Sequence, residues 1–145
     1  MKLKLSHIGM AVDNASEFTK LFEVLGFKEI TDPEPDPIQK VTARFVTVGT
    51  KQPIHIELLE PTHEGSPISN FLKKRGGGLH HLCFEVADVE EASNVLKEKG
   101  FKMVCPPVEC VGYDRSFKRE CGETSKIAFF LFANKILIEF LQKGR

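Results

Sequence analysis

Alternating apolar and polar residues open the chain and predict a β-strand over residues 3–12. A helix is expected next, because Asn14 and Glu17 form a helix-start pattern and Gly26 is a natural stop. Between these signals, apolar residues recur at the spacing of one helix face. Further strands are predicted at residues 27–30, 41–48 and 54–59. The first part of the chain is therefore a predicted β-α-β-β-β unit.

A proline-rich and a glycine-rich segment interrupt this pattern. Residues 31–38 contain three prolines and are expected to form an extended loop. Ser66 followed by Pro67 predicts the start of a short helix, which the glycines at 76–78 end. We therefore place a linker helix within residues 62–77.

The same order of elements then recurs. Asp88 and Gly100 are expected to bound a second helix. The strands predicted around it are 78–86, 101–105, 125–132 and 136–141, with an irregular polar stretch at 106–124. We expect one α+β domain over residues 1–145, built of two modules at about 1–61 and 78–145.

A constant offset relates the two modules. His81 follows His7 by 74 positions. Glu139 follows Glu57 by 82 positions, so the second module contains eight extra residues, which we place in the irregular stretch. The offset of 74 also relates Leu5 to Leu79, Val12 to Val86, Glu17 to Glu91, Gly26 to Gly100, Phe27 to Phe101 and Lys28 to Lys102. Such agreement indicates two copies of one supersecondary unit.

Composition and charge exclude several functional classes. Lys+Arg and Asp+Glu both total 20, and this zero net charge argues against a nucleic-acid partner. No apolar run reaches the roughly 18 residues that would span a membrane, and the N-terminus lacks a signal-peptide core. Four cysteines without a Cys-x-x-Cys pair are typical of free thiols in a reducing compartment. We expect a cytoplasmic protein that acts on a small molecule.

Two histidines and two glutamates occupy matched positions in the two modules. His7 and His81 lie early in the first strand of each module, and Glu57 and Glu139 lie in the last strand. Buried carboxylates are costly unless a cation neutralises them, and imidazole with carboxylate suits a divalent metal. The four residues therefore predict a metal site with room for water or substrate. Strand alternation places His80 on the face opposite His81.

The chain resembles the vicinal oxygen chelate superfamily, which includes glyoxalase I, methylmalonyl-CoA epimerases, extradiol dioxygenases and drug-resistance binding proteins. The likeness is greatest to the epimerases. Its motifs are Leu5-Ser6-His7-Ile8-Gly9-Met10-Ala11-Val12, Ile56-Glu57-Leu58-Leu59-Glu60-Pro61, Ser66-Pro67-Ile68, Phe71-Leu72, Gly78-Leu79-His80-His81 and Leu137-Ile138-Glu139. The resemblance implies paired modules in a cupped mixed sheet around one divalent metal ion, held by His7, Glu57, His81 and Glu139. It also implies a homodimer. A set of histidine and glutamate ligands suits Zn, Co, Ni, Mn or Fe.

The epimerase likeness implies proton transfer at the α-carbon of an acyl-CoA thioester, through a metal-stabilised enolate. Glu139 is the implied catalytic acid–base group. A second acid is expected in the loop before the third strand, but Ile38 stands at that position. Asp36 or Glu34 would replace the missing acid only after a shift of the loop.

Three residues in the irregular stretch are candidates for substrate binding. Arg115 and Lys118 carry the positive charge that an anionic substrate needs, and Tyr113 has a hydroxyl that can form a hydrogen bond. A glyoxalase I-like lyase acting on a thiol hemithioacetal is an alternative function, although Ala11 occupies the place of an expected arginine. A non-catalytic binding protein of the same fold is another, and the intact metal set argues against it.

Overall fold

The computed structural model describes residues 1–145 as eight strands in one sheet and four α-helices. The first module contains β1 (Lys4–Ala11), α1 (Ala15–Val24), β2 (Glu34–Asp36), β3 (Val41–Val48) and β4 (Ile54–Pro61). The helix α2 (Pro67–Arg75) connects it to the second module. That module contains β5 (Gly78–Glu85), α3 (Val89–Glu98), β6 (Lys102–Glu109), α4 (Val111–Ser116), β7 (Lys126–Leu131), a short 3₁₀ turn (Ala133–Lys135) and β8 (Leu137–Gln142).

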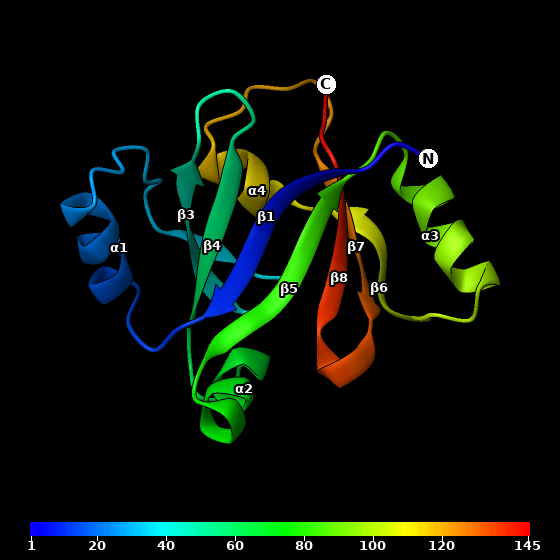
Figure 1. The fold of residues 1–145 in the computed structure, drawn as a ribbon. Helices are drawn as coiled ribbons and strands as arrows, with labels where there is room; N and C mark the ends of the chain where they lie inside the picture. The colour runs from blue at the N-terminus through cyan, green and yellow to red at the C-terminus, as the bar shows by residue number, and fades with distance from the viewer.

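The sheet joins two similar halves in the order β2-β3-β4-β1-β5-β8-β7-β6. Within the halves, β1 pairs parallel with β4 and β5 pairs parallel with β8. The antiparallel pair of β1 and β5 connects the halves at the centre of the sheet (Figure 1). This arrangement confirms the predicted α+β class and the curved mixed sheet.

Helices α1 and α3 cover the outer face of the sheet, one on each half (Figure 1). Val12, Ala15 and Leu58 form the buried cluster under α1, and Val89 with Phe140 belongs to the cluster under α3. A third cluster, which includes Phe45, Cys83 and Phe129, fills the inner face between the halves. The predicted metal ligands His7 and His81 contact this cluster on the inner face.

The predicted helix starts are confirmed by their capping contacts. Asn14 accepts a hydrogen bond from the Ser16 backbone N–H, and Asp88 accepts from the N–H groups of Glu90 and Glu91. Each of these contacts satisfies a backbone donor that the first helical turn leaves free. Ser66 likewise caps α2, because its side chain accepts a hydrogen bond from the Ile68 N–H. None of the helices is long and apolar enough to cross a membrane.

Two parts of the strand prediction are wrong. No strand forms at 27–30, where a single bridge joins Ile30 to Val46, and the proline-rich segment instead contains β2. Proline is tolerated there because β2 is an edge strand. The backbone N–H that proline lacks would face solvent and would not pair with another strand. The stretch 106–124 is also more regular than expected, because β6 continues to Glu109 and α4 follows it.

Candidate metal centre

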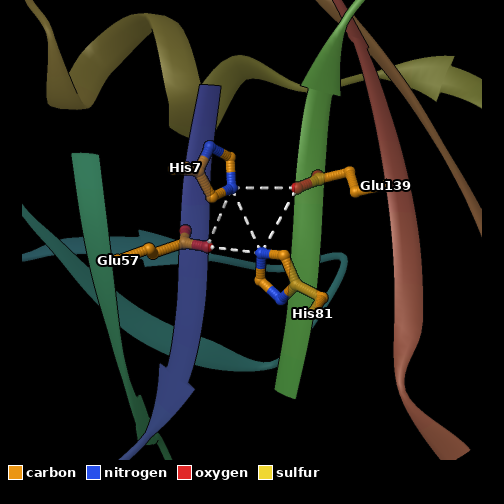
Figure 2. Close-up of side chains that lie close together, drawn as sticks. All are labelled: His7, Glu57, His81 and Glu139. Carbon is orange, nitrogen blue, oxygen red and sulfur yellow. Dashed lines mark hydrogen bonds and ion pairs between the residues drawn. The ribbon is translucent and has the colours of Figure 1, made fainter. Parts of the chain in front are cut away.

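The four predicted ligands come from four adjacent strands at the middle of the sheet. Gly9, two residues after His7, pairs with Glu57 of β4. Cys83, two residues after His81, pairs with Glu139 of β8. The pairing is therefore the same in both modules, and it brings the glutamate of each module beside its histidine. All four side chains point toward one another from β1, β4, β5 and β8 (Figure 2).

One atom of each side chain contributes to a compact buried cluster. The Nε2 atoms of His7 and His81 lie 3.1 Å apart. Glu57 Oε1 lies 3.0 Å from His81 Nε2, and Glu139 Oε1 lies 3.0 Å from His7 Nε2. All four ligand atoms lie within 4.8 Å of one another, and each residue is at most 4 % exposed.

This cluster fits a divalent cation. Ligand atoms about 2.1 Å from one ion are separated by about 3.0 to 3.4 Å when their bond angles are those of octahedral or tetrahedral sites. Glu57 Oε1 and Glu139 Oε1 are buried without a hydrogen-bond partner, although ring nitrogens lie close to both. Leaving two carboxylates buried together costs several kcal/mol per ion unless positive charge lies between them. A metal ion at the centre would supply that charge.

The second nitrogen of each imidazole is held by the residue that precedes it. His7 Nδ1 lies 3.2 Å from Ser6 Oγ, and His81 Nδ1 lies 2.9 Å from His80 Nδ1. A hydrogen on each Nδ1 leaves the lone pair of Nε2 directed at the cluster, as metal-binding histidines require. His80 can accept such a hydrogen bond because burial and nearby His81 lower its pKa to about 3, so its ring is neutral.

The contact between His80 and His81 contradicts the prediction that these side chains lie on opposite faces. The pairing of β1 with β5 shifts register between Leu5 and His7 and again between Gly9 and Met10. Such irregularities place an extra residue on one strand and interrupt the alternation of side chains. The extra residues are Ser6 on β1 and His80 on β5, the two residues that hold the ligand rings.

The charges of the cluster perturb the pKa values of its members. Burial lowers the pKa of His7, but hydrogen bonding to Glu139 and Glu57 opposes burial, and the pKa of His7 lies well above its usual value. Burial raises the pKa of Glu57, but His7 and His81 outweigh burial and hold it below the usual value. Both directions follow from imidazole and carboxylate groups lying side by side in a buried site, where a protonated imidazole or a cation would balance the negative charge.

Apolar groups enclose the cluster. His7 meets the edge of Phe45 with ring centroids 5.3 Å apart, and His81 meets Phe129 at 5.7 Å. Burial raises the pKa of the Cys83 thiol to about 12, so Cys83 packs beside His7 as a neutral thiol. Gly9 is required on the other side, because a Cβ there would overlap the His81 ring.

A small cavity lies next to the cluster and is covered by α4. Its volume is about 10 Å³, enough for about one water molecule. His7, Glu57 and Glu139 line it together with Asp36 and Tyr113. The predicted substrate-binding residue Tyr113 is thus beside the cluster, and burial raises the pKa of its hydroxyl.

The other two predicted substrate-binding residues lie elsewhere. Arg115 and Lys118 are exposed and line a separate surface pocket. On the inner face, His55 Nδ1 lies 3.0 Å from Thr47 Oγ1. Burial lowers the pKa of His55 to about 4. The structure therefore brings only Tyr113 of the three candidates to the cluster.

The sequence pattern did not predict that Ser6, His80 and Gly9 contact the rings of His7 and His81. One signal was available, because Ser6 and His80 are themselves related by the offset of 74 that relates the two ligand histidines. Residues at equivalent repeat positions next to each ligand suggest equivalent roles. Gly9 has no such signal, since its repeat partner is Cys83.

Comparison with known proteins agrees with this geometry. The pattern of the Glyoxalase/Bleomycin resistance protein/Dioxygenase superfamily matches residues 6–129. An ethylmalonyl-CoA/methylmalonyl-CoA epimerase of Cereibacter sphaeroides is 36% identical over 102 residues, covering 70% of this chain and 74% of the relative. A mitochondrial methylmalonyl-CoA epimerase of Dictyostelium discoideum is 35% identical over 104 residues; the match covers 71% of this chain but only 61% of that relative.

A solved structure extends the likeness to the whole chain. It is the crystal structure of a hypothetical protein from Bacillus halodurans C-125, with a TM-score of 0.78 and 33% identity, covering 100% of this chain and 97% of that one. Its fold supports the two-module architecture on which the four-residue cluster depends. From the matched pattern, the relatives and the shared fold, the chain belongs to the Glyoxalase/Bleomycin resistance protein/Dioxygenase superfamily.

Proposed function

We propose that the chain is a metal-dependent epimerase that acts at the α-carbon of a malonyl-type acyl-CoA thioester. The observation that carries this proposal is the convergence of His7, Glu57, His81 and Glu139, whose buried carboxylate oxygens have no hydrogen-bond partner. The similar proteins from Cereibacter and Dictyostelium are epimerases of methylmalonyl-CoA, which supports this substrate class over a hemithioacetal. A lyase function gains no support from them.

The chemistry needs a group that stabilises negative charge on the substrate. A divalent cation held by the four residues would stabilise charge on the thioester oxygen while the α-proton is removed. Glu139 would take that proton, and its position both in the cluster and in the wall of the cavity supports this role. Phe45 and the other apolar neighbours exclude water, which strengthens electrostatic interactions during the reaction.

Substrate needs more space than the inner cavity provides. A second, largely apolar pocket of about 360 Å³ lies near the cluster, with Ile38, Phe129 and His80 in its wall. Gln39 lines both spaces. We infer that a shift of Gln39 joins them when the thioester binds, with Tyr113 contacting the acyl group. Arg115 and Lys118 remain candidates for the anionic end of an acyl-CoA.

Metal content and proton exchange test the proposal together. The purified protein is expected to hold one divalent ion and to exchange the α-proton of methylmalonyl-CoA with deuterium in D₂O. Glu139→Gln should abolish this exchange, because it removes the base and weakens the metal site. Glu109→Gln, a matched change at an exposed position of β6, should keep both properties.

Other outcomes discriminate among functions. Bound metal without any exchange would exclude the epimerase reaction, and turnover of a glutathione hemithioacetal would assign the lyase activity instead. If His7→Ala and Glu139→Ala both left the metal content unchanged, the metal site itself would be misassigned. Sedimentation would test the homodimer, which remains a prediction.

A further inference from the structure

We propose that Asp36 is the second acid–base group of this site, acting on the opposite face of the substrate from Glu139. The inference rests on the proposed epimerase function and deepens it. Inversion at a carbon needs one group on each side of the planar intermediate. The resemblance to the epimerases implies a second acid at the position of Ile38, whose side chain cannot transfer a proton.

The structure directs Asp36, rather than Ile38, toward the cluster. Asp36 and Glu34 both line the cavity that contains His7, Glu57 and Glu139. Of these two acids only Asp36 is buried, at 6 % exposure, whereas Glu34 is partly exposed. Ile38 lines the separate apolar pocket. The pairing of Asp36 with Val41 of β3 fixes the end of β2, so Asp36, two residues before Ile38, is held beside the cavity.

Several contacts hold the Asp36 carboxylate in place. Oδ1 accepts hydrogen bonds from the backbone N–H of Ile38 at 2.9 Å and from that of Gln39 at 3.3 Å. Oδ2 accepts from Gln39 Nε2 at 2.9 Å. Gly112 of α4 packs against it, since a Cβ there would lie 3.7 Å from the Asp36 Cβ. A carboxylate held from three sides has the fixed position that proton transfer requires.

Asp36 and Glu139 approach the cavity from different modules. Asp36 lies on β2, at one edge of the sheet, and Glu139 lies on β8, beyond the central strands in the other half. The sheet curves from one half to the other (Figure 1), and both residues line one cavity. Because they enter it from separate halves, a planar intermediate between them would present one face to each.

The environment of Asp36 favours its role as a proton donor. Burial, the largest effect, and the charge of Glu57 raise its pKa above the usual value, although hydrogen bonds from Gln39 and Ile38 oppose this. A buried carboxyl with a raised pKa keeps its proton at higher pH than a surface aspartate does. This agrees with the geometry but does not by itself define the role.

The transfer is balanced without any other reactant. The Glu139 carboxylate takes the α-proton, so the C–H bond breaks, an O–H bond forms and the electron pair moves onto the thioester oxygen. The Asp36 carboxyl then gives its proton to the opposite face of the α-carbon, which restores the C=O bond. The reverse reaction exchanges the two roles.

Stereochemically resolved exchange in D₂O tests the assignment. Each methylmalonyl-CoA epimer is incubated separately with the metal-loaded protein, and inversion and deuterium uptake are both measured. For Asp36→Asn, inversion should fall by about 100-fold or more, the usual contribution of a positioned acid or base. Deuterium uptake should persist for one epimer only, because Glu139 still removes and returns its proton on one face. A residue with a merely structural role would not separate these readouts.

Control variants keep the result interpretable. Asp32→Asn, an exposed change just before β2, should leave inversion and exchange unchanged. Asp36→Glu restores a carboxyl and should regain part of the inversion. Metal content and far-UV circular dichroism are measured for every variant, and each should match the parent protein.

Several outcomes would overturn the assignment. The first is an inversion rate in Asp36→Asn within threefold of that of the parent protein. The second is an equal loss of deuterium exchange from both epimers in Asp36→Asn and in Asp36→Glu. The third is loss of inversion in Glu34→Gln but not in Asp36→Asn. Failure of the proposed function is distinguishable, because the parent protein itself would then show no exchange with metal bound.

Discussion

Replacing Gly9 by alanine gives the most direct test of how the fold positions the four proposed metal ligands. Gly9 pairs with both Glu57 and His81 across its neighbouring strands, and the His81 ring lies directly over it. A Cβ at Gly9 would overlap atoms of that imidazole. His81 is completely buried between Phe129 and the cluster, so its ring has little freedom to move aside.

The expected magnitude follows from this lack of space. Inserting a methyl group into a tightly packed core costs about 1 to 3 kcal/mol of unfolding free energy. Movement of the ring also withdraws Nε2, one of the four ligand atoms. Loss of a supporting contact alone weakens metal sites by about 10- to 100-fold, so displacing a ligand should cost at least as much. The conformation of Gly9 is not itself the cause, since its φ is not positive.

Two measurements separate the packing effect from the loss of the ligand. Urea unfolding with a chelator gives the stability of the metal-free form, and metal titration gives the affinity. Gly122→Ala is the control, because the nearest atom to its new Cβ, the Arg145 carbonyl oxygen, lies at an ordinary 3.5 Å. Stoichiometric binding by Gly9→Ala with the affinity of Gly122→Ala would refute the placement of His81 in the site.

Three further predictions follow from particular contacts. Ser6→Ala removes the partner of His7 Nδ1 and should weaken metal affinity by about tenfold or more in a metal titration, without loss of the fold. Unfolding free energy should decrease as the pH falls from about 6.5 to about 4, because the unfolded chain protonates His55 before the folded chain does. His55→Gln should make this decrease smaller in denaturation at each pH, whereas the exposed control His63→Gln should not. Tyr113→Phe should raise KM for methylmalonyl-CoA with unchanged metal content, and an unchanged KM would mean that its hydroxyl does not contact substrate.

Much of the cluster was predictable from the sequence because it depends on repetition and periodicity. The offset of 74 identified His7 and His81 as equivalent, and alternation within the strands placed both on the inner face. The helix starts at Asn14 and Asp88 depend on local capping, and both are confirmed. By contrast, β2 forms in a proline-rich segment only because it pairs with β3. Local residue preferences do not predict this pairing.

The sequence by itself determined the two-module plan and the four residue types that suit a metal, because backbone periodicity and an internal repeat are properties of neighbouring residues. Only the tertiary structure decided which atoms meet. The bulges at Ser6 and His80 depend on the pairing of β1 with β5, and the burial of Asp36 depends on a strand pair and on α4 from the other module. These contacts join residues far apart in the chain, so their geometry exists only once the sheet has formed.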